Sequence, residues 1–207
     1  MMKIKLTDVG KRFNREWIFR HLNFEFHSQI SYAIIGPNGS GKSTLLQIIA
    51  GATIFNEGQI EYFLSDKNID TEKVYTNISI AAPYLELVEE MTLIEFLQFH
   101  SSLKTWLPAF DSKKIISIIN LEDAAQKQIR YYSSGMKQRV KLAQAIFSNV
   151  PVVLLDEPCT NLDEEGIILY KILVNDHCKN RLLIVSSNDI QEYDFCEERI
   201  DMRNYKG

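Results

Sequence analysis

The nine residues from Gly36 to Thr44, "GPNGSGKST", constrain this chain more than any other stretch. They match the pattern G-x-x-x-x-G-K-[ST] and lie between a short apolar run, "SYAIIG", and an amphipathic segment, "TLLQIIAG". Glycines let such a loop curl so that backbone N–H groups point inward, and the helix that follows adds the positive end of its dipole. A plain glycine-rich turn would need neither the lysine nor the hydroxyl. The stretch therefore predicts a phosphate-binding loop.

The side chains of this loop have distinct predicted roles. Lys42 is expected to bridge the β- and γ-phosphates of a nucleotide, and Ser43 is expected to give its hydroxyl to Mg²⁺. The backbone N–H groups from Asn38 onward are expected to face phosphate oxygens. The predicted nucleotide-binding residues of the loop are Gly36, Pro37, Asn38, Gly39, Ser40, Gly41, Lys42, Ser43 and Thr44.

A second stretch, "VVLLDEP", places two acidic residues at the end of an apolar run. Asp156 is expected to hold the hydration shell of Mg²⁺, and Glu157 beside it is expected to polarise the water that attacks the γ-phosphate. An acidic pair in this place could instead cap the element that follows. The phosphate loop upstream favours the metal-binding and catalytic roles.

Two kinds of strand pattern occur along the chain. Residues alternate between polar and apolar in the N-terminal part, as in half-buried antiparallel strands. Short continuous apolar runs indicate strands that are buried on both faces of a parallel sheet. Helical spacing separates these runs, so an α/β fold is predicted. The predicted antiparallel strands are 3–9, 20–26 and 59–64, and the predicted buried strands are 31–36, 152–156 and 182–187.

The segment from about Met91 to Ile129 differs, because its apolar residues recur every three or four positions and no strand-like run occurs. A chain of 207 residues is long enough for one domain with a full core. We therefore expect a single domain over 1–207, with a parallel-sheet core, an N-terminal antiparallel β subdomain and a helical lobe inserted over about 84–135.

Composition narrows the classes of partner. The formal net charge of -4 gives no general reason to bind nucleic acid or an anionic membrane surface. The three cysteines have no paired spacing, which favours a reducing compartment over a disulfide framework. No run of about 18 apolar residues occurs, so no membrane-spanning helix is expected, and a function at a membrane would require a separate partner.

Four stretches in a fixed order, "GPNGSGKST", "YSSGMKQR", "LLDEP" and "NLD", resemble the nucleotide-binding subunits of ABC (ATP-binding cassette) transporters, and the resemblance covers essentially the whole chain. It implies the P-loop NTPase fold, with ATP and Mg²⁺ as cofactors. It also implies a head-to-tail dimer, formed with a second copy or with another cassette, in which two ATP molecules are sandwiched.

In this family a short signature at the start of a helix closes over the γ-phosphate held by the opposite subunit. Ser133, Ser134 and Gly135 occupy that place, and the helix N-terminus that they begin suits an anion. Standing alone, the stretch would be interpreted as an ordinary serine N-cap. The resemblance makes these three residues part of the predicted ATP site.

Further positions follow from their order along the chain. Phe13 matches the place where the family sets an aromatic ring against adenine, although a buried core phenylalanine is an equal alternative. Asp163, in "TNLD", matches a loop that contacts the partner subunit, but it could also be a turn or cap aspartate. The stretch "APYLELVEEMTLIEFLQF" is expected to contact a membrane partner, or simply to pack in the core and lobe.

The chain departs from the family at two positions in the expected site. Where the family has a glutamine that touches Mg²⁺, this chain has Pro83 or its neighbour Ala82, and Asn188 stands where the family has a histidine at the γ-phosphate. Asparagine can hydrogen-bond a phosphate but cannot carry charge. The resemblance therefore predicts MgATP binding and hydrolysis at a reduced rate, with Glu157, Lys42 and Asn188 as catalytic residues.

The leading hypothesis is an ATPase subunit that powers a separate integral membrane permease, with a lean towards an exporter, and that lies on the cytoplasmic face of the membrane through this permease. One alternative is a soluble ABC-type ATPase that acts in DNA repair or on the ribosome without a permease. Another is a regulatory cassette that binds ATP with little hydrolysis. The departures at Pro83 and Asn188 favour that last alternative, whereas the retained Glu157 opposes it.

Overall fold

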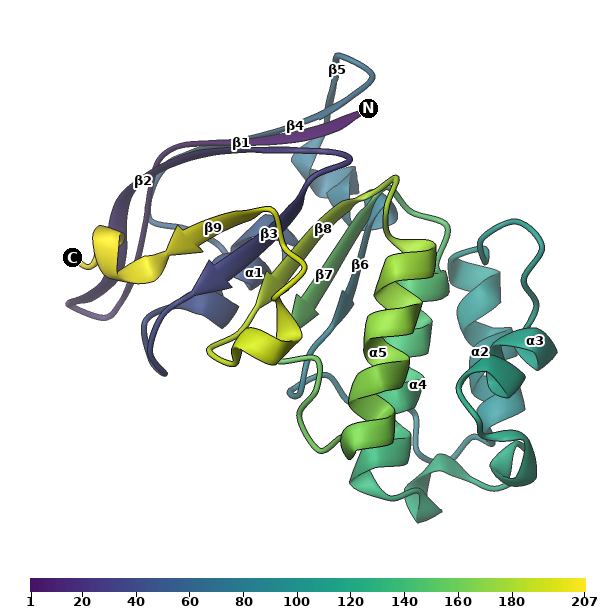
Figure 1. Ribbon diagram of the computed structural model, residues 1–207. Helices are drawn as coiled ribbons and strands as arrows, with labels where there is room; N and C mark the ends of the chain where they lie inside the picture. The colour runs from purple at the N-terminus through teal and green to yellow at the C-terminus, as the bar shows by residue number, and fades with distance from the viewer.

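The computed structural model describes residues 1–207 and contains two β-sheets (Figure 1). The strands are β1 (Met2–Phe13), β2 (Glu16–His27), β3 (Ser31–Ile35), β4 (Glu57–Leu64), β5 (Lys67–Ile69), β6 (Ile78–Ala81), β7 (Val152–Asp156), β8 (Leu182–Ser186) and β9 (Glu198–Asp201). The first sheet is antiparallel, in the order β2-β1-β4-β5. The second has the order β6-β7-β8-β3-β9, and all its pairings are parallel. The predicted α/β fold with an N-terminal antiparallel sheet is confirmed.

Each predicted strand overlaps an observed strand, but β5, β6 and β9 were not predicted from strand patterns. These three strands have only three or four residues each. A segment of that length is too short for period-two alternation to be recognised in the sequence.

Five α-helices accompany the sheets: α1 (Lys42–Ile49), α2 (Leu93–Leu103), α3 (Ser112–Ile118), α4 (Ser134–Phe147) and α5 (Glu164–His177). In Figure 1, α4 and α5 lie side by side against the parallel sheet, and α2 and α3 lie beyond them. The stretch predicted to be helical contains α2 and α3, while its treatment as an inserted lobe over about 84–135 stays a prediction. None of the five helices combines the length and the apolar character needed to cross a membrane.

The parallel sheet is buried on both faces, as its apolar runs predict. In β7, Val153 and Leu155 join one cluster of buried side chains, and Val152 and Leu154 join the other. The first cluster packs the sheet against α4 and α5, and the second packs it against α1 and the antiparallel sheet. Because successive side chains of a strand point to opposite faces, a continuous apolar run fills both layers. The loops that follow β3, β6, β7 and β8 consequently meet at one edge of the sheet.

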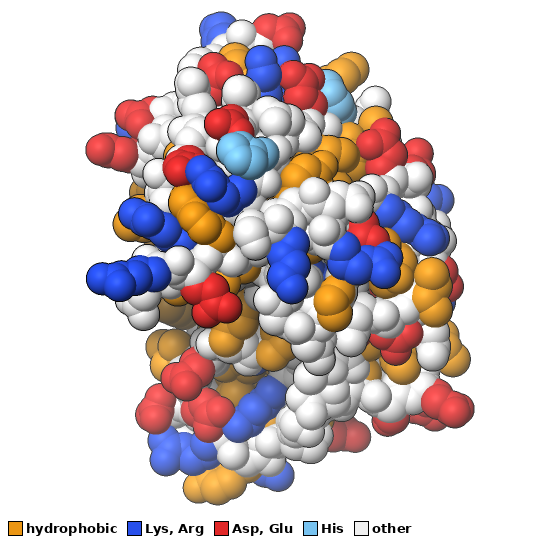
Figure 2. All heavy atoms as spheres, turned by 90° about the vertical axis from the view of Figure 1, so that its left-hand side faces the viewer, with side chains coloured by type: hydrophobic (Ala, Val, Ile, Leu, Met, Phe, Trp, Pro, Cys, Tyr) orange, Lys and Arg blue, Asp and Glu red, His pale blue; other side chains and the backbone are white.

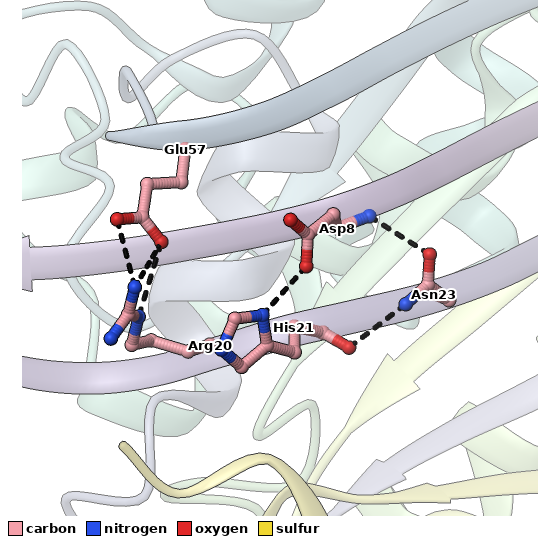
Figure 3. A network of polar contacts seen from close by, with 5 residues as sticks. All are labelled: Asp8, Arg20, His21, Asn23 and Glu57. Atoms are coloured by element: carbon pink, nitrogen blue, oxygen red, sulfur yellow. Dashed lines mark hydrogen bonds and ion pairs between the residues drawn. The ribbon is translucent and has the colours of Figure 1, made fainter.

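A β-bulge interrupts the pairing of β1 with β2 (Figure 3). Leu6 and Val9 are both buried although they are three positions apart, a spacing that strict alternation does not allow. Asp8, with a φ of 52°, absorbs the extra residue, and its backbone N–H donates to Asn23 Oδ1 at 2.9 Å. His21 Nδ1 lies 2.7 Å from the carboxylate of Asp8. The bulge thus keeps the apolar side of β1 on the core.

Candidate nucleotide site

The predicted phosphate loop joins the end of β3 to the start of α1. Lys42 is the first residue of α1 and is only 5% exposed. Its Nζ donates to the carbonyl oxygens of Gly36 at 3.0 Å and Pro37 at 3.3 Å, so the lysine lies over its own loop. The N–H of Ser40 also donates to the oxygen of Pro37, at 3.1 Å. The loop is therefore closed on itself around the lysine ammonium.

Glycine is required at two positions of this loop. Gly41 has a φ of 94°, and a Cβ placed there would lie 2.6 Å from Cγ2 of Ile18 on β2. Gly36 has a φ of 146°, and a Cβ there would lie 2.7 Å from Ser40 Oγ. Both the backbone conformation and the available space exclude a side chain. Gly41 therefore allows the loop to pack against β2, and Gly36 allows the loop to fold closely over Ser40.

Asp156 ends β7 beside the phosphate loop and is 1% exposed. Burial raises the pKa of its carboxyl group, while the nearby side chains of Ser186, Ser43 and Lys42 act in the opposite direction. Its Oδ1 has no hydrogen-bond partner, and neither has the buried Oγ of Ser186. A buried carboxylate oxygen without a partner, next to a serine hydroxyl, is prepared to bind a cation.

The residues around the phosphate loop are suited to hold the phosphates of a nucleotide and a Mg²⁺ ion. Ser40 Oγ, in the loop itself, is a further buried oxygen without a partner. Buried polar atoms are usually hydrogen-bonded, so a cluster of unpaired ones at one edge of the sheet is suited to a polar ligand. Ser43 and Asp156 would hold Mg²⁺, and Lys42 with the loop N–H groups would hold the phosphates. When bound, Mg²⁺ would neutralise charge on the phosphate oxygens.

Glu157 follows β7 in the left-handed backbone conformation, with a φ of 43°. Its N–H donates to the carbonyl oxygen of Ser186 at 2.8 Å, which holds the residue against β8. The next helix, α5, is capped by Asp163, so the acidic pair at the end of β7 does not cap that helix. Glu157 lines a pocket of about 340 Å³ together with Ile18 and the phosphate loop. A non-glycine residue held in this conformation is consistent with a functional position.

Of the two further predicted site residues, Asn188 contacts the phosphate loop, whereas Phe13 lies exposed at the end of β1. Asn188 Nδ2 donates to Asn38 Oδ1 at 3.2 Å, so this side chain reaches the phosphate loop. Phe13 ends β1 and is 51% exposed, with the ammonium of Lys11 4.7 Å from its ring centroid. The alternative in which Phe13 is a buried core residue is therefore wrong. A role for its ring against adenine stays a prediction.

The end of β6 supplies no amide side chain to the site. Ala81 pairs with Leu155 in parallel register, so the next residue, Ala82, lies beside Asp156. Ala82 is fully buried, and Pro83 follows it. The place at which the family would have its glutamine therefore holds an alanine and a proline.

The signature residues Ser133, Ser134 and Gly135 lie at the start of α4. Ser133 is the N-cap, and its Oγ accepts a hydrogen bond from the N–H of Met136 at 3.2 Å. Ser134 begins the helix without a positive φ, so serine in place of glycine introduces no backbone strain. A Cβ on Gly135 would lie 3.0 Å from the carbonyl oxygen of Asn161, so the helix start packs closely against the loop after β7.

The signature residues and the phosphate loop line different pockets. The signature pocket has a volume of about 540 Å³ and also includes Arg139 and Asp163, but no residue of the phosphate loop. In Figure 1, α4 begins at the bottom of the view, whereas the loop between β3 and α1 lies to the left. Asp163 caps α5 by accepting from the N–H of Gly166 at 2.8 Å, and Arg139 lies 3.3 Å from its carboxylate. Asp163 is therefore the N-cap of α5. Its contact with a partner subunit stays a prediction.

The apolar stretch after β6 divides between the interior and the surface. Leu93 and Leu97 are fully buried in the core. Tyr84, Val88 and Phe99 are 45%, 39% and 46% exposed. Core packing therefore explains part of the stretch, and the exposed side chains remain free for a partner.

No sequence pattern pointed to Glu192, which lies beside the site. It is 5% exposed, and its Oε1 accepts from the N–H of Cys159 at 2.8 Å, so it links the loop after β8 to the loop after β7. Its Oε2 has no partner, and burial raises the pKa of the carboxyl group. The only possible signal was an acid four residues after Asn188, and an acid in a polar stretch does not by itself indicate burial.

Comparison with known proteins agrees with this geometry. Residues 19–160 match the family described as ABC transporter. The chain is 27% identical over 209 residues to the uncharacterized ABC transporter ATP-binding protein YybJ of Bacillus subtilis (strain 168), covering 97% of this chain and 93% of YybJ. It is 33% identical over 156 residues to the cytochrome c biogenesis ATP-binding export protein CcmA of Xylella fastidiosa (strain 9a5c), covering 75% of this chain and 70% of CcmA.

The fold also matches solved structures of such cassettes. The bacterial ABC transporter cassette MJ0796, in its dimeric structure, gives a TM-score of 0.76 at 24% identity, over 96% of this chain and 94% of that one. The matched region contains the phosphate loop, the signature residues and the acidic pair whose geometry is described above. The chain therefore belongs to the ABC transporter family, as one of its ATP-binding ATPase cassettes.

Proposed function

We propose that this chain is the ATP-hydrolysing subunit of an exporter and powers a separate integral membrane permease. The observation that carries the proposal is the meeting, at one edge of the parallel sheet, of a closed phosphate loop, an unpaired oxygen of Asp156 and the constrained Glu157. A module that only bound a nucleotide would have no need of a water-polarising carboxylate.

Each residue of the site is proposed to have a separate role in hydrolysis. Lys42 and the loop N–H groups bind the β- and γ-phosphates, while Ser43 and Asp156 hold the cation. Glu157 orients the attacking water and takes its proton as the water oxygen bonds to the γ-phosphorus, which releases ADP and phosphate. Asn188, already in contact with the phosphate loop, donates an amide N–H to a γ-phosphate oxygen without transferring a proton.

The signature residues are proposed to act on the ATP held by a second cassette. Their pocket shares no residue with the phosphate-loop pocket of the same chain, which supports completion of each site in trans. In a head-to-tail dimer, the free N–H groups and the positive dipole end of α4 would face the γ-phosphate of the partner. The exposed ring of Phe13 would stack on the adenine. The partner is a second copy of this chain or a related cassette.

The permease is proposed to contact the exposed side chains after β6. Tyr84, Val88 and Phe99 offer apolar surface there. Closure of the dimer on ATP and its reopening after hydrolysis would move this surface and drive the permease. Export is supported by the name of CcmA, an ATP-binding export protein. The chain would then lie on the cytoplasmic face of the membrane, held there by the permease.

Surface charge supports a protein partner over nucleic acid. Figure 2 shows the left-hand face of Figure 1, where Lys and Arg side chains are interspersed with Asp and Glu. The formal net charge is -4. A nucleic-acid site would need a continuous basic surface to neutralise phosphates.

The test compares wild type with Glu157→Gln and with Glu72→Gln, a matched control at an exposed carboxylate of the 3₁₀ turn Thr71–Asn77. MgATP turnover is measured on the purified chains and on chains purified with their permease, and dimerisation is followed by light scattering. Glu157→Gln should lose at least about 10²-fold in turnover and accumulate as an ATP-bound dimer, because one positioned catalytic group is removed. Wild-type turnover with the permease that is no faster than that of Glu157→Gln contradicts the proposal.

A second candidate is a cassette that binds ATP and regulates a partner with little hydrolysis. The observation that favours it is the lack of a polar side chain at Ala82 and Pro83, together with Asn188 in place of an ionisable group. This candidate predicts that wild type and Glu157→Gln both bind ATP and dimerise, and that neither turns over ATP even with the permease present.

A further inference from the structure

One peptide group directly after the proposed catalytic acid is hydrogen-bonded on both sides. It joins Pro158 to Cys159 and follows Glu157 in the chain. Its carbonyl oxygen accepts from Gln138 Nε2 at 2.7 Å, and its N–H donates to Glu192 Oε1 at 2.8 Å. Because a peptide group is planar, it cannot turn without breaking one of these two bonds. The two side chains therefore clamp the main chain next to Glu157.

Both clamping side chains are buried, and they come from different elements. Gln138 is 3% exposed and lies on α4, one helical turn after Ser134 of the signature. Glu192 is 5% exposed and ends the 3₁₀ turn Ile190–Glu192, which follows β8. The carbonyl oxygen of Glu192 accepts from the hydroxyl of the fully buried Tyr170 on α5, at 2.7 Å. Since both bonds are shielded from solvent, removing either side chain would leave a main-chain group without a partner.

The segment between the clamp and Glu157 is stiff. The ring of Pro158 locks its φ, so the ψ torsions of Glu157 and Pro158 are the only free main-chain rotations before the clamped peptide. The carbonyl oxygen of Glu157 also accepts from the N–H of Thr160 at 3.1 Å. The φ of 43° at Glu157 is unfavourable for a residue with a side chain unless the surroundings hold it. The clamp is one of the contacts that hold this conformation.

We propose that Gln138 and Glu192 are positioning residues for Glu157, which act through the Pro158–Cys159 peptide to keep the carboxylate directed at the attacking water. The inference rests on the proposed function, in which Glu157 takes a proton from that water. Neither clamping side chain lines the pocket around the phosphate loop. Loss of either should therefore slow hydrolysis and leave ATP binding unchanged.

Gln138→Met and Glu192→Met test the clamp, because methionine is close in size to both side chains but cannot form the bonds to the peptide. Turnover is measured with the permease present, and ATP affinity is measured by calorimetry. Each variant should have a kcat about 10–100-fold below wild type, since misplacing a catalytic group by about 1 Å can cost about 10²-fold in rate. The ATP affinity of each should equal that of wild type.

Ser79→Ala is the matched control. Ser79 is 4% exposed, and its Oγ donates to the carbonyl oxygen of Ala145 at 2.7 Å. This substitution also removes a buried side-chain bond, but that bond is made to the opposite end of α4 from Gln138. Ser79→Ala should match wild type in kcat and in ATP affinity.

Two further variants separate positioning from a general loss of stability. The amide oxygen of glutamine can still accept from the N–H of Cys159, so Glu192→Gln should keep the wild-type kcat. The double variant Gln138→Met/Glu192→Met should be about as slow as the slower single variant, because both side chains act on one peptide. Circular dichroism and the ligand-free melting temperature establish that each variant is folded. A Glu192→Gln variant as slow as Glu192→Met, or losses that multiply in the double variant, would count against the inference.

The possible failures are distinguishable. If wild type with the permease turns over ATP no faster than Glu157→Gln, the proposed function is wrong, and this inference is wrong with it. If wild type turns over ATP and both Gln138→Met and Glu192→Met match it, only the inference about the clamp is wrong. A loss of ATP affinity in these two variants, or an equal loss of kcat in Ser79→Ala, also overturns it, because the side chains would then support the nucleotide site or the fold in general.

Discussion

Asp156→Asn should make the nucleotide-free protein more stable and remove most of its response to MgATP. In the structure, the carboxylate is 1% exposed and its Oδ1 has no hydrogen-bond partner. An unpaired charged oxygen in the interior is unfavourable until a cation binds to it. The neutral amide of asparagine has nearly the same shape, so it should relieve part of this cost while losing the charge that holds Mg²⁺.

The size of both effects can be estimated. Leaving a buried polar group unpaired costs about 1–3 kcal/mol, and relieving about 1 kcal/mol raises the melting temperature of a chain of this size by roughly 2–4 °C. At a free MgATP concentration about 100 times the Kd, binding stabilises the wild type by about 2.7 kcal/mol, or roughly 5–11 °C. With an affinity about 100-fold weaker, the same MgATP concentration stabilises the variant by only about 0.4 kcal/mol, which leaves a shift of roughly 1–2 °C.

The assay is thermal unfolding followed by circular dichroism, with and without MgATP, for wild type, Asp156→Asn and Asp66→Asn. Asp66 is an exposed turn residue with a φ of 64°, a conformation that asparagine adopts readily, so this control should behave as wild type. If Asp156→Asn lowers the ligand-free melting temperature and keeps the MgATP shift, the carboxylate is a structural group, and the assignment of the cation site is wrong.

Three further substitutions test other parts of the structure. Gly41→Ala forces a Cβ to 2.6 Å from Ile18 at a φ of 94° and should weaken ATP binding at least about tenfold by calorimetry, whereas Gly39→Ala, whose Cβ would meet no atom, should weaken it less. Arg181→Met leaves three main-chain carbonyl oxygens at the ends of α4 and α5 without their donor. It should lower the free energy of unfolding by about 3 kcal/mol and the melting temperature by roughly 6–12 °C. The melting temperature of Arg181→Lys should lie between those of wild type and Arg181→Met. Glu192→Gln should stabilise the protein at pH 7, because the pKa of Glu192 is raised in the folded state. The free energy of unfolding of the wild type should fall as the pH rises above the ordinary carboxyl pKa of 4.5 towards the raised pKa. Melting curves of the variant across that pH range should lack this fall. An unchanged pH profile in Glu192→Gln would contradict the assignment.

The parts of the fold that were predicted correctly depend on local signals. The phosphate loop is specified by glycines, a lysine and a hydroxyl at fixed spacing, and its position after "SYAIIG" follows from a continuous apolar run. The acidic pair was found because it ends the same kind of run, at β7. Each of these features is contained within about ten consecutive residues, so predicting it requires no knowledge of contacts between distant segments.

The parts that were missed depend on contacts between distant segments. The strand β6 was not predicted, and its place beside β7 depends on pairing between two strands that are separated along the chain by α2, α3 and α4. The burial of Glu192 depends on the loop after β7 folding against the loop after β8. The exposure of Phe13, which excludes the buried-core alternative, depends on what covers the end of β1.

By itself, the sequence determined the chemistry that this protein offers: a phosphate loop, a hydroxyl and a carboxylate for a cation, an acid for water, and a capped helix start for an anion. Spacing along the chain carries that information, because each group lies at the end of a strand or the start of a helix that forms from its own residues. Only the tertiary structure decided which of these groups meet. The parallel sheet brings the loops after β3, β6, β7 and β8 to one edge, and it leaves Asp156 with an unpaired oxygen there. It also keeps the signature residues in a separate pocket. Strand register and burial set those distances, and both depend on residues far apart in the chain.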